Sequence, residues 1–417
     1  MTVRETNPNQ HDPGQRELCD RIAQRIADSP NHQIPFADFM ALALYDPEYG
    51  YYATNRVNIG GAGDFYTAPH LGSDFGELLA EQFAEMWRLL DYPNPFTLVE
   101  MGAGQGLLVR DILRYLHRHH DACFEALDYV IVEDSPALRQ EQQQRMAKLV
   151  QTFGRLHWRT WEEIAPNSIV GCFFSNELID ALPVHRVIWK DGALHELCVT
   201  LADTTNTTGS TNSNPDEEKQ SFSEAIAPLS TPALQHYFEQ SSIDFAAARY
   251  PDGYTTEANL AALEWMETVA QRLQRGYVLT IDYGYPAQRY YLPTRRSGTL
   301  QCYFQHRHHD DPLVNIGLQD ITAHANFTAL ERQGETCGLQ TLGYTQQGLF
   351  LMALGMGDRI AAVSTLTPDE SLTISDILGR REALHTLIDP AGMGNFGVLL
   401  QGKGEIPSQS VRGFCMP

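Results

Sequence analysis

The chain has 417 residues, of which 43% are hydrophobic, so it can bury a large core as one elaborated domain or as two. Its formal net charge of −22 argues against nucleic acid as a partner, because phosphate binding needs a basic face, and suits a cationic substrate. No apolar run approaches the roughly 20 residues that cross a bilayer. The seven cysteines are dispersed without a C-x-x-C pair, which favours reduced thiols and predicts no metal site.

The N-terminus is polar and carries no targeting pattern that we can identify. It lacks the apolar core of a secretory signal, and it is not an Arg-rich amphipathic helix of the mitochondrial type. These features predict a cytoplasmic location, with residues 1–15 disordered. Helical spacing of apolar residues then predicts helices over 18–26, 36–44 and 75–90, with a loop rich in glycine and aromatic residues at 58–71.

The segment FTLVEMGAGQGLLV, residues 96–109, is the most informative in the chain. It predicts a short buried strand at 96–99 and a helix over 107–119, joined by a turn with Gly102, Gly104 and Gly106. A strand, a glycine turn and a helix N-terminus allow a nucleotide-like ligand to approach the backbone closely. Glycines that only pack a helix tightly against a strand are the alternative.

Two acidic residues near this turn favour S-adenosylmethionine over a nicotinamide cofactor. A nicotinamide turn has Gly-x-Gly-x-x-Gly with an acidic residue about 20 positions further on. Here Leu107 takes the third glycine position, and the acidic residue that ends the next strand, Glu133, lies beyond that spacing. Glu100 can lie near the ammonium and sulfonium end of S-adenosylmethionine, while Glu133 can accept hydrogen bonds from both ribose hydroxyls.

Strands and helices alternate after the turn, which predicts a mostly parallel, doubly wound sheet. We expect strands at 129–133, 152–156 and 169–175, with a helix over 136–150. The alternation then stops. A hairpin of 184–189 and 194–201 is predicted around the type I′ signal Asp191-Gly192. It is followed by a mobile polar loop at 203–222, a helix over 257–275, a strand at 277–281 and an antiparallel edge strand at 397–401.

Polar side chains follow two of the predicted strands, where ligands bind in open α/β sheets. Asn176, Glu177 and Asp180 follow the strand at 169–175, and Asp282 ends the strand at 277–281. Methyl transfer requires an aligned nucleophile and removal of a proton, and Asn176 with Glu177 could hold an N–H nucleophile. Alternatively, Asn176 and Asp180 cap the helix that follows.

Two further features have open interpretations. His324 is either a functional or a hydrogen-bonded structural histidine. An aromatic set either lines a substrate cleft or packs in the core; its members are Tyr283, Tyr285, Tyr290, Tyr291, Tyr303 and Phe304.

Taken together, these segments resemble the MidA family of S-adenosylmethionine-dependent methyltransferases. The similarity spans roughly residues 35–350 and includes the segments GYY (50–52), GDFYT (63–67), FGELL (75–79), EMGAGQG (100–106), NELIDALPVHR (176–186), DYG (282–284) and DITAHANF (320–327). The family is related to the mitochondrial complex I assembly factor that methylates an arginine of a complex I subunit.

The resemblance implies a class I methyltransferase fold: a Rossmann-like, seven-stranded sheet ending in an antiparallel strand, with an N-terminal helical cap and insertions. It implies that the three glycines hold the methionine end of S-adenosylmethionine and Glu133 its ribose. Asp64 and Thr67 would close over that site, and Glu177 would face the substrate.

We therefore predict a protein methyltransferase that modifies arginine in a partner protein, and the resemblance implies that the partner is a subunit of a respiratory-type complex. Glu177, Asn176, Asp180 and Asp282 are the predicted catalytic residues. A cofactor-binding assembly factor or scaffold and a small-molecule methyltransferase are the alternatives, and the oligomeric state is left open. The expected domain organisation is a tail and first helix (1–30), a helical cap (31–94), the first part of the core (95–202), a polar loop and insertion (203–256) and the second part of the core (257–417).

Overall fold

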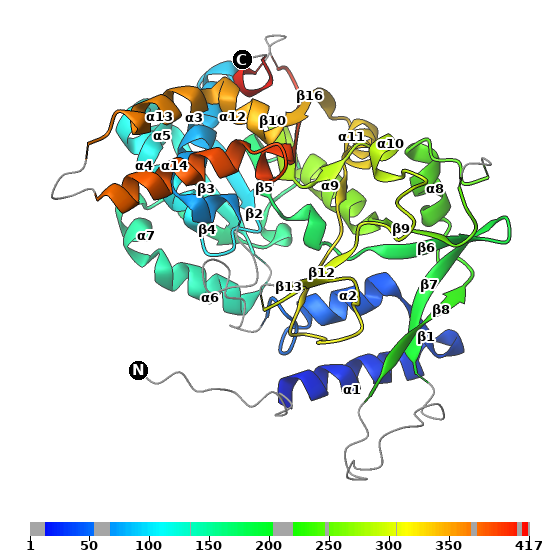
Figure 1. Cartoon of the computed structure of the whole chain (residues 1–417). Coiled ribbons are helices and arrows are strands. Elements are labelled where there is room, and N and C mark those ends of the chain that lie inside the picture. The colour runs from blue at the N-terminus through cyan, green and yellow to red at the C-terminus, as the bar shows by residue number, and fades with distance from the viewer. Residues whose placement is uncertain are drawn as a thin grey trace.

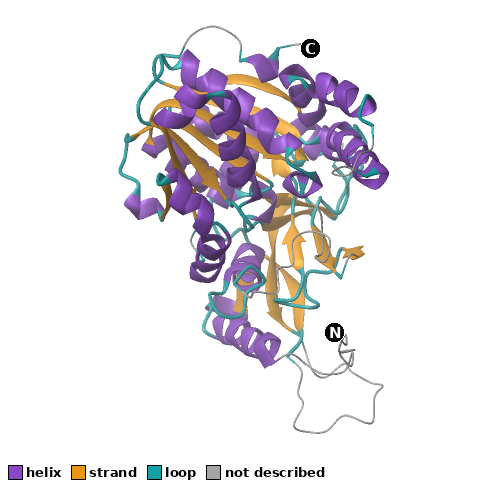
Figure 2. Ribbon diagram, turned by 90° about the vertical axis from the view of Figure 1, so that its left-hand side faces the viewer, coloured by secondary structure: helices purple, strands orange, loops and turns teal. Residues whose placement is uncertain are grey.

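The computed structural model describes residues 13–53, 67–133, 135–202, 220–246, 250–305, 307–367, 373–406 and 411–415. The chain forms two lobes, a larger α/β body and a smaller lobe that contains the N-terminal helices and a second sheet (Figures 1 and 2). Among the described residues, no helix is both long and apolar enough to cross a membrane. The expected domain boundaries stay a prediction.

A seven-stranded sheet in the order β16-β17-β10-β5-β2-β3-β4 forms the centre of the body. The strands are β2 (Phe96–Met101), β3 (Leu127–Val132), β4 (Leu156–Arg159), β5 (Ile169–Asn176), β10 (Leu273–Asp282), β16 (Gln340–Gln346) and β17 (Gly397–Lys403). From β4 to β10 all neighbours are parallel, and β17 runs antiparallel to both β10 and β16. The Rossmann-like, seven-stranded fold class predicted from the sequence is confirmed.

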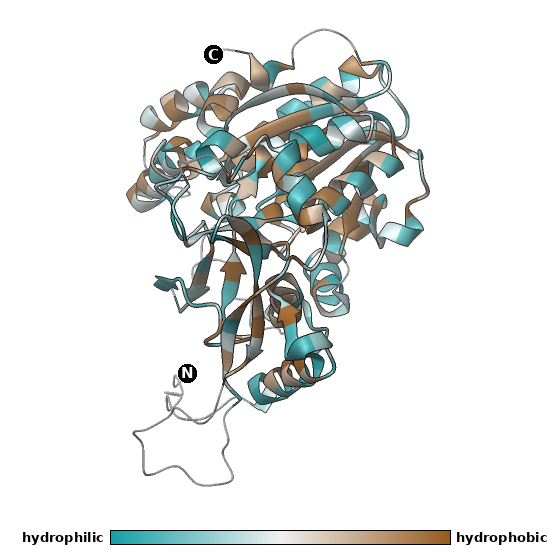
Figure 3. Ribbon diagram, turned by 90° about the vertical axis from the view of Figure 1, so that its right-hand side faces the viewer, coloured by the Kyte–Doolittle hydropathy of each residue, from teal (hydrophilic) through white to brown (hydrophobic). Residues whose placement is uncertain are grey.

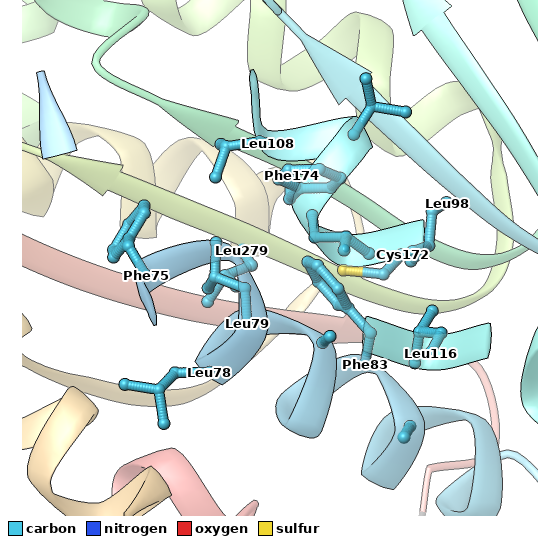
Figure 4. Packing of buried hydrophobic residues seen from close by; sticks show 14 of the residues in the cluster. Phe75, Leu78, Leu79, Phe83, Leu98, Leu108, Leu116, Cys172, Phe174 and Leu279 are labelled. Carbon is cyan, nitrogen blue, oxygen red and sulfur yellow. The ribbon is translucent and has the colours of Figure 1, made fainter. Parts of the chain in front are cut away.

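Helices cover both faces of this sheet, because side chains alternate along each strand. Cys172 and Phe174 of β5 join one apolar cluster with α3 and α4, whereas Phe173 joins a second cluster with α9 and α11. Figure 4 shows the first cluster, in which Phe75 and Phe83 of α3 lie against the strands. The central strands are largely hydrophobic, and the covering helices carry many hydrophilic residues (Figure 3).

The helices of the body are α3 (Asp74–Leu89), α4 (Leu107–His119), α5 (Asp121–Ala126), α6 (Pro136–Arg145), α7 (Ala147–Phe153), α9 (Leu260–Arg272), α11 (Phe327–Thr336), α12 (Gln347–Leu354), α13 (Met356–Ser364) and α14 (Ile374–Ile388).

The smaller lobe is organised around a five-stranded sheet. Its strands are β1 (Gln33–Pro35), β6 (His185–Lys190), β7 (Ala193–Leu201), β8 (Phe222–Ala227) and β9 (Tyr254–Ala258). The predicted hairpin is confirmed as β6 and β7, and Asp191 and Gly192 have the positive φ of a type I′ turn. Helices α1 (Pro13–Ala27) and α2 (Phe36–Tyr45) pack on this sheet through a third apolar cluster.

Short elements connect the two lobes. They are α8 (Ala233–Gln240), α10 (Ala287–Tyr290), a parallel pair of β11 (Gly284–Tyr285) and β15 (Ala325–Asn326), and a small antiparallel sheet of β12 (Gln301–Phe304), β13 (Arg307–His309) and β14 (Asp320–Thr322).

Several predicted element boundaries are wrong. The helix expected over 257–275 is strand β9, then α9, then the start of β10, because the Asn259 side chain accepts from the Ala262 N–H and caps a new helix there. The helix expected over 136–150 breaks at Met146 into α6 and α7. Gly154, with φ +72°, ends α7, so β4 begins at Leu156 rather than near 152.

Three other expectations concern the tails and the sheet edge. The strand near 397–401 is not an edge strand, because β17 lies between β10 and β16 and hydrogen-bonds on both sides. Helix α1 begins at Pro13, inside the segment 1–15 that was expected to be disordered. Residues 1–12 of that segment lie outside the described residues. Of the expected polar loop, 203–219 also lie outside them, and β8 begins at Phe222.

Candidate active site

The glycine turn follows β2 and has a left-handed backbone at its three glycines. Gly102, Gly104 and Gly106 have φ of +70°, +51° and +74°, the left-handed region that other residues rarely adopt. A Cβ at Gly102 would also lie 2.8 Å from Leu178 Cδ1. The turn thus brings bare backbone to the carboxyl end of the sheet, at the start of α4.

A cavity of about 310 Å³ lies over this turn. Residues 101–105 of the turn form one wall of the cavity, and another part of its wall is apolar. The apolar lining comes mainly from Leu107, Leu108, Val132, Leu138, Leu178 and Trp161. Polar side chains also line the cavity, so it combines apolar and polar walls, as a site for a small organic ligand does.

The two acidic residues predicted for the cofactor both line this cavity. Glu100 is 2% exposed and accepts a hydrogen bond from the Tyr129 hydroxyl at 2.6 Å, and burial raises the pKa of Glu100 to about 7. The Glu133 carboxylate accepts from the Ser135 N–H at 3.0 Å and from Gln142 Nε2 at 3.1 Å. These contacts hold Glu133 at the end of β3 in a fixed orientation.

The polar groups in the lining of the cavity fit S-adenosylmethionine. Asn176 Oδ1 and His70 Nε2 are buried without a partner among the described residues. The amide oxygen can therefore accept a hydrogen bond from a ligand, and the imidazole nitrogen can donate or accept one. Thr67 lines the same cavity, with its Oγ1 2.6 Å from His70 Nδ1. The predicted residue Asp64 lies outside the described residues.

A second cavity, of about 330 Å³, adjoins the first and shares Tyr52 and Glu177 with it. It is lined by Tyr52, Glu177, Asp180, Tyr283, Gly284, Tyr285, Gln301, Tyr303, Asp320, Thr322, His324, Ala391, Gly392, Asn395 and Phe396. We call the first the cofactor cavity and the second the acceptor cavity.

Strand alternation explains the polar wall that β12 and β14 give the acceptor cavity. Gln301 lies opposite Thr322, and Tyr303 opposite Asp320, and all four line the cavity. The intervening pair, Cys302 and Ile321, is fully buried in the apolar cluster of the smaller lobe. The small sheet therefore presents one polar face to the cavity and one apolar face to the core.

Glu177 lies in the wall common to both cavities. Its φ of +52° is unusual for a residue other than glycine and marks the sharp turn after β5. Glu177 Oε1 accepts from the Ala68 N–H and from Asn176 Nδ2, both at 3.1 Å. Burial, with a contribution from the charge of Asp180, raises the pKa of Glu177 to about 8.

Two tyrosine hydroxyls hold the other carboxylates of the acceptor cavity. Tyr283 donates to Asp180 Oδ2 at 2.5 Å, and Tyr52 donates to Asp320 Oδ1 at 2.9 Å. Asp180 Oδ1 is buried with no partner among the described residues. Burial raises the pKa of Asp180 to about 6. Asn176 and Asp180 are not helix caps, since the short helix at 179–181 begins after Leu178 without a side-chain cap.

Asp282 has a different role from the one predicted. It is fully buried and absent from the lining of both cavities; its Oδ2 accepts from the N–H groups of Leu178 (3.1 Å) and Ile179 (2.8 Å). Its Oδ1 accepts from the Tyr283 N–H at 2.8 Å. Asp282 is therefore a positioning residue that fixes the turn carrying Glu177 and Asp180.

Sequence reasoning missed Tyr52, Gln301, Asp320 and Thr322, although all but Gln301 lie in segments that carry the family resemblance. The aromatic set divides. Tyr283, Tyr285 and Tyr303 line the acceptor cavity, whereas Tyr290 and Tyr291 are buried in the core. The two groups are distinguished by their positions in the fold, since Tyr290 and Tyr291 lie at the end of α10.

The fold and the glycine-turn cavity define a class I, S-adenosylmethionine-dependent methyltransferase. The model of a family of S-adenosyl-L-methionine-dependent methyltransferases matches residues 78–345. The chain belongs to this family, and S-adenosylmethionine is its cofactor.

Named relatives cover most of the chain. It is 30% identical over 385 residues to the Drosophila melanogaster "Protein arginine methyltransferase NDUFAF7 homolog, mitochondrial", with 87% of this chain and 79% of the relative covered. It is 26% identical over 391 residues to the Homo sapiens "Protein arginine methyltransferase NDUFAF7, mitochondrial", with 88% and 80% covered. Both names include a mitochondrial location, which contradicts the cytoplasmic location predicted from the sequence.

Two solved structures share the whole fold. A Burkholderia thailandensis protein with bound S-adenosyl-homocysteine is 29% identical, with 98% of both chains covered and a TM-score of 0.82. A native crystal structure from the same organism is 30% identical, with the same coverage and a TM-score of 0.80.

Proposed function

We propose that this methyltransferase modifies the side chain of an arginine in a partner protein, with the cofactor in the first cavity and the guanidinium in the second. The names of the fruit-fly and human relatives support this proposal. The resemblance to the MidA family suggests a subunit of a respiratory-type complex as the partner.

One observation carries the proposal: the acceptor cavity offers hydrogen-bond acceptors, and three of the four tyrosines that line it donate to other lining residues. Tyr52 donates to Asp320, Tyr283 to Asp180, and Tyr303 to Gln301 Oε1 at 2.8 Å. A guanidinium has five N–H donors and no acceptor, so it is the side chain that such a cavity matches best.

The charges of the acceptor cavity also favour a cationic side chain. Three carboxylates line it, those of Glu177, Asp180 and Asp320, and no lysine or arginine is among its described lining residues. Buried carboxylates without a cationic partner cost free energy, and this cost raises the pKa of Glu177 and Asp180. A bound cation would remove that cost, whereas a carboxylate or phosphate acceptor would be repelled.

We assign the proton transfer to Glu177. When bound, S-adenosylmethionine supplies a methyl group on a sulfonium. The carboxylate of Glu177, placed where the two cavities meet, holds the guanidinium nitrogen and accepts the proton that this nitrogen loses on methylation. Its pKa of about 8 suits a base that works near neutral pH. The hydrogen bonds that Asn176 and Ala68 donate to Oε1 fix the orientation of the Glu177 carboxylate. Asp180 holds the guanidinium nitrogens that lie farther from Glu177.

The proposal is tested by mapping the methyl group. Cells that lack the protein are supplied with wild type or with Gly104→Val, and their proteins are compared by mass spectrometry. We expect methylarginine at one or a few sites that only wild type restores. Methylation of a carboxylate, a cysteine or a small metabolite, or no wild-type-dependent methylation at all, would overturn the proposal.

A further inference from the structure

His324 follows β14 and lines the acceptor cavity but not the cofactor cavity. Its ring stacks on Tyr285, with centroids 5.3 Å apart and planes 15° apart, and meets Tyr283 edge-on at 5.1 Å. Its backbone N–H donates to Thr299 Oγ1 at 3.1 Å. Two aromatic neighbours and a fixed backbone therefore hold the imidazole in one place in the wall.

The surroundings of His324 keep its imidazole neutral. Burial, and then the positive charge of Arg295, lower the pKa of His324 to about 4. Arg295 and Arg289 both lie over the Tyr285 ring, at 5.0 and 4.5 Å from its centroid. The other charged groups facing the cavity are the carboxylates of Glu177, Asp180 and Asp320.

A neutral imidazole has one donor and one acceptor nitrogen. His324 Nδ1 is buried without a partner among the described residues, although a buried polar atom is normally hydrogen-bonded. A structural histidine would have its ring nitrogens satisfied by the protein. The unsatisfied nitrogen, in a ring that lines the cavity, points instead to a ligand.

We infer that His324 is a specificity-determining residue of the acceptor cavity, where its neutral imidazole accepts a hydrogen bond from an N–H of the bound guanidinium. This inference rests on the proposed function. The carboxylates balance the charge of the guanidinium, and a further carboxylate would add to the cost of burying charge. A neutral acceptor fixes the orientation of the planar group without that cost.

The test measures binding of N-acetyl-arginine amide to the protein saturated with S-adenosylhomocysteine, followed by NMR titration. His324→Phe keeps an aromatic ring for the stack on Tyr285 and removes both nitrogens, and His324→Gln returns an acceptor. His308→Phe is the matched control, because His308 is exposed on β13 of the same small sheet. Affinity for S-adenosylhomocysteine and the melting temperature are measured for each variant.

We expect His324→Phe to weaken arginine binding by about tenfold or more, the loss typical of a hydrogen bond to a charged group. His324→Gln should recover part of that loss, and His308→Phe should bind like wild type. The affinity for S-adenosylhomocysteine should not change. The melting temperature should stay the same or rise, because an unsatisfied buried nitrogen is removed.

Unchanged arginine binding by His324→Phe would overturn the inference while leaving the proposed function intact. A parallel fall in melting temperature and in affinity for both ligands would overturn it too, because it would assign His324 a structural role. Wild type that binds no arginine amide would overturn the proposed function, and the inference with it.

Discussion

The two cavities meet at Glu177 but are assembled in different ways. One wall of the cofactor cavity comes from a continuous stretch, the end of β2, the glycine turn and the start of α4, and the rest of its lining comes from segments between residues 45 and 265. The acceptor cavity combines side chains from residue 52 to residue 396, carried by both lobes and by the small sheet between them. The glycine-turn wall of the cofactor cavity is thus encoded locally, whereas the whole acceptor cavity depends on how distant segments pack.

The two cavities also differ in the interactions that they offer to a ligand. The cofactor cavity is mostly apolar and uses backbone shape, so a single added side chain can close it. The acceptor cavity depends on charge, with three carboxylates held by tyrosines and by backbone N–H groups. Changes in the first should therefore abolish binding of the cofactor, whereas changes in the second should act on the acceptor and leave the cofactor bound.

The largest effect is expected for Gly104→Val. A β-branched residue is strained at φ +51°, and its side chain would enter the cofactor cavity. Calorimetry should show affinity for S-adenosylmethionine reduced at least roughly a hundredfold, and no response to NAD in either protein. Gly154→Val is the control, since Gly154 has φ +72° with open space around it and lines neither cavity. Undiminished binding by folded Gly104→Val would contradict the assignment of this cavity.

Glu177→Gln should separate the two cavities. The amide can keep the contacts of Oε1 but cannot hold a cation or accept its proton, so methyl transfer should fall by about a hundredfold or more. Affinity for S-adenosylmethionine should remain within about twofold of wild type. Glu382→Gln, on the exposed surface of α14, is the matched control. Joint loss of transfer and cofactor binding would show that Glu177 has a structural role.

Binding of arginine should strengthen as the pH rises. Asp180 and Glu177, with pKa values of about 6 and 8 in the empty protein, are protonated at low pH and cannot pair with a guanidinium. Ionisation of each restores a negative charge, so affinity for N-acetyl-arginine amide should increase from pH 5 to pH 8.5. Glu177→Gln should remove the upper part of this increase. A flat profile, with both proteins folded throughout, would mean that these carboxylates do not meet the ligand.

The contrast between the cavities also explains what the sequence could reveal. The glycine turn, Glu100 and Glu133 were predictable because one strand, one turn and one helix place them together within a short stretch. Asn176, Glu177 and Asp180 were found because they follow a predicted strand. Asp282 was expected to contact the substrate, and only the hydrogen bonds show that it fixes a turn.

The other wall of the acceptor cavity could not be predicted residue by residue. Tyr52 and Asp320 are 268 positions apart, and their hydrogen bond depends on the packing of α2 and the small sheet against each other. Tyr285 lies on β11, which pairs with β15, and faces the cavity, whereas Tyr290 lies on α10 and is buried in the core, a division that composition does not encode. Misplaced boundaries, such as that of α9, likewise reflect tertiary packing that overrides local propensity.

A smaller effect is expected for Asp282→Asn. The side chain keeps its size, but one oxygen becomes an NH₂ group facing backbone N–H donors, at a cost of about 1–3 kcal/mol in stability. The melting temperature should fall, and the rate of methyl transfer should fall more than the affinity for S-adenosylmethionine, because the turn that carries Glu177 is loosened. Unchanged stability together with lost arginine binding would show instead that Asp282 contacts the arginine directly.

The central claim is that the cavity next to the cofactor recognises a guanidinium by offering it acceptors and negative charge. The most direct measurement compares N-acetyl-arginine amide with N-acetyl-citrulline amide, which has nearly the same shape but is neutral and carries an oxygen in place of one nitrogen. Both are titrated into the wild-type protein saturated with S-adenosylhomocysteine at pH 8. We predict that arginine binds at least about tenfold more tightly, as charge-assisted hydrogen bonds require. Equal affinity, or a preference for citrulline, would contradict the claim.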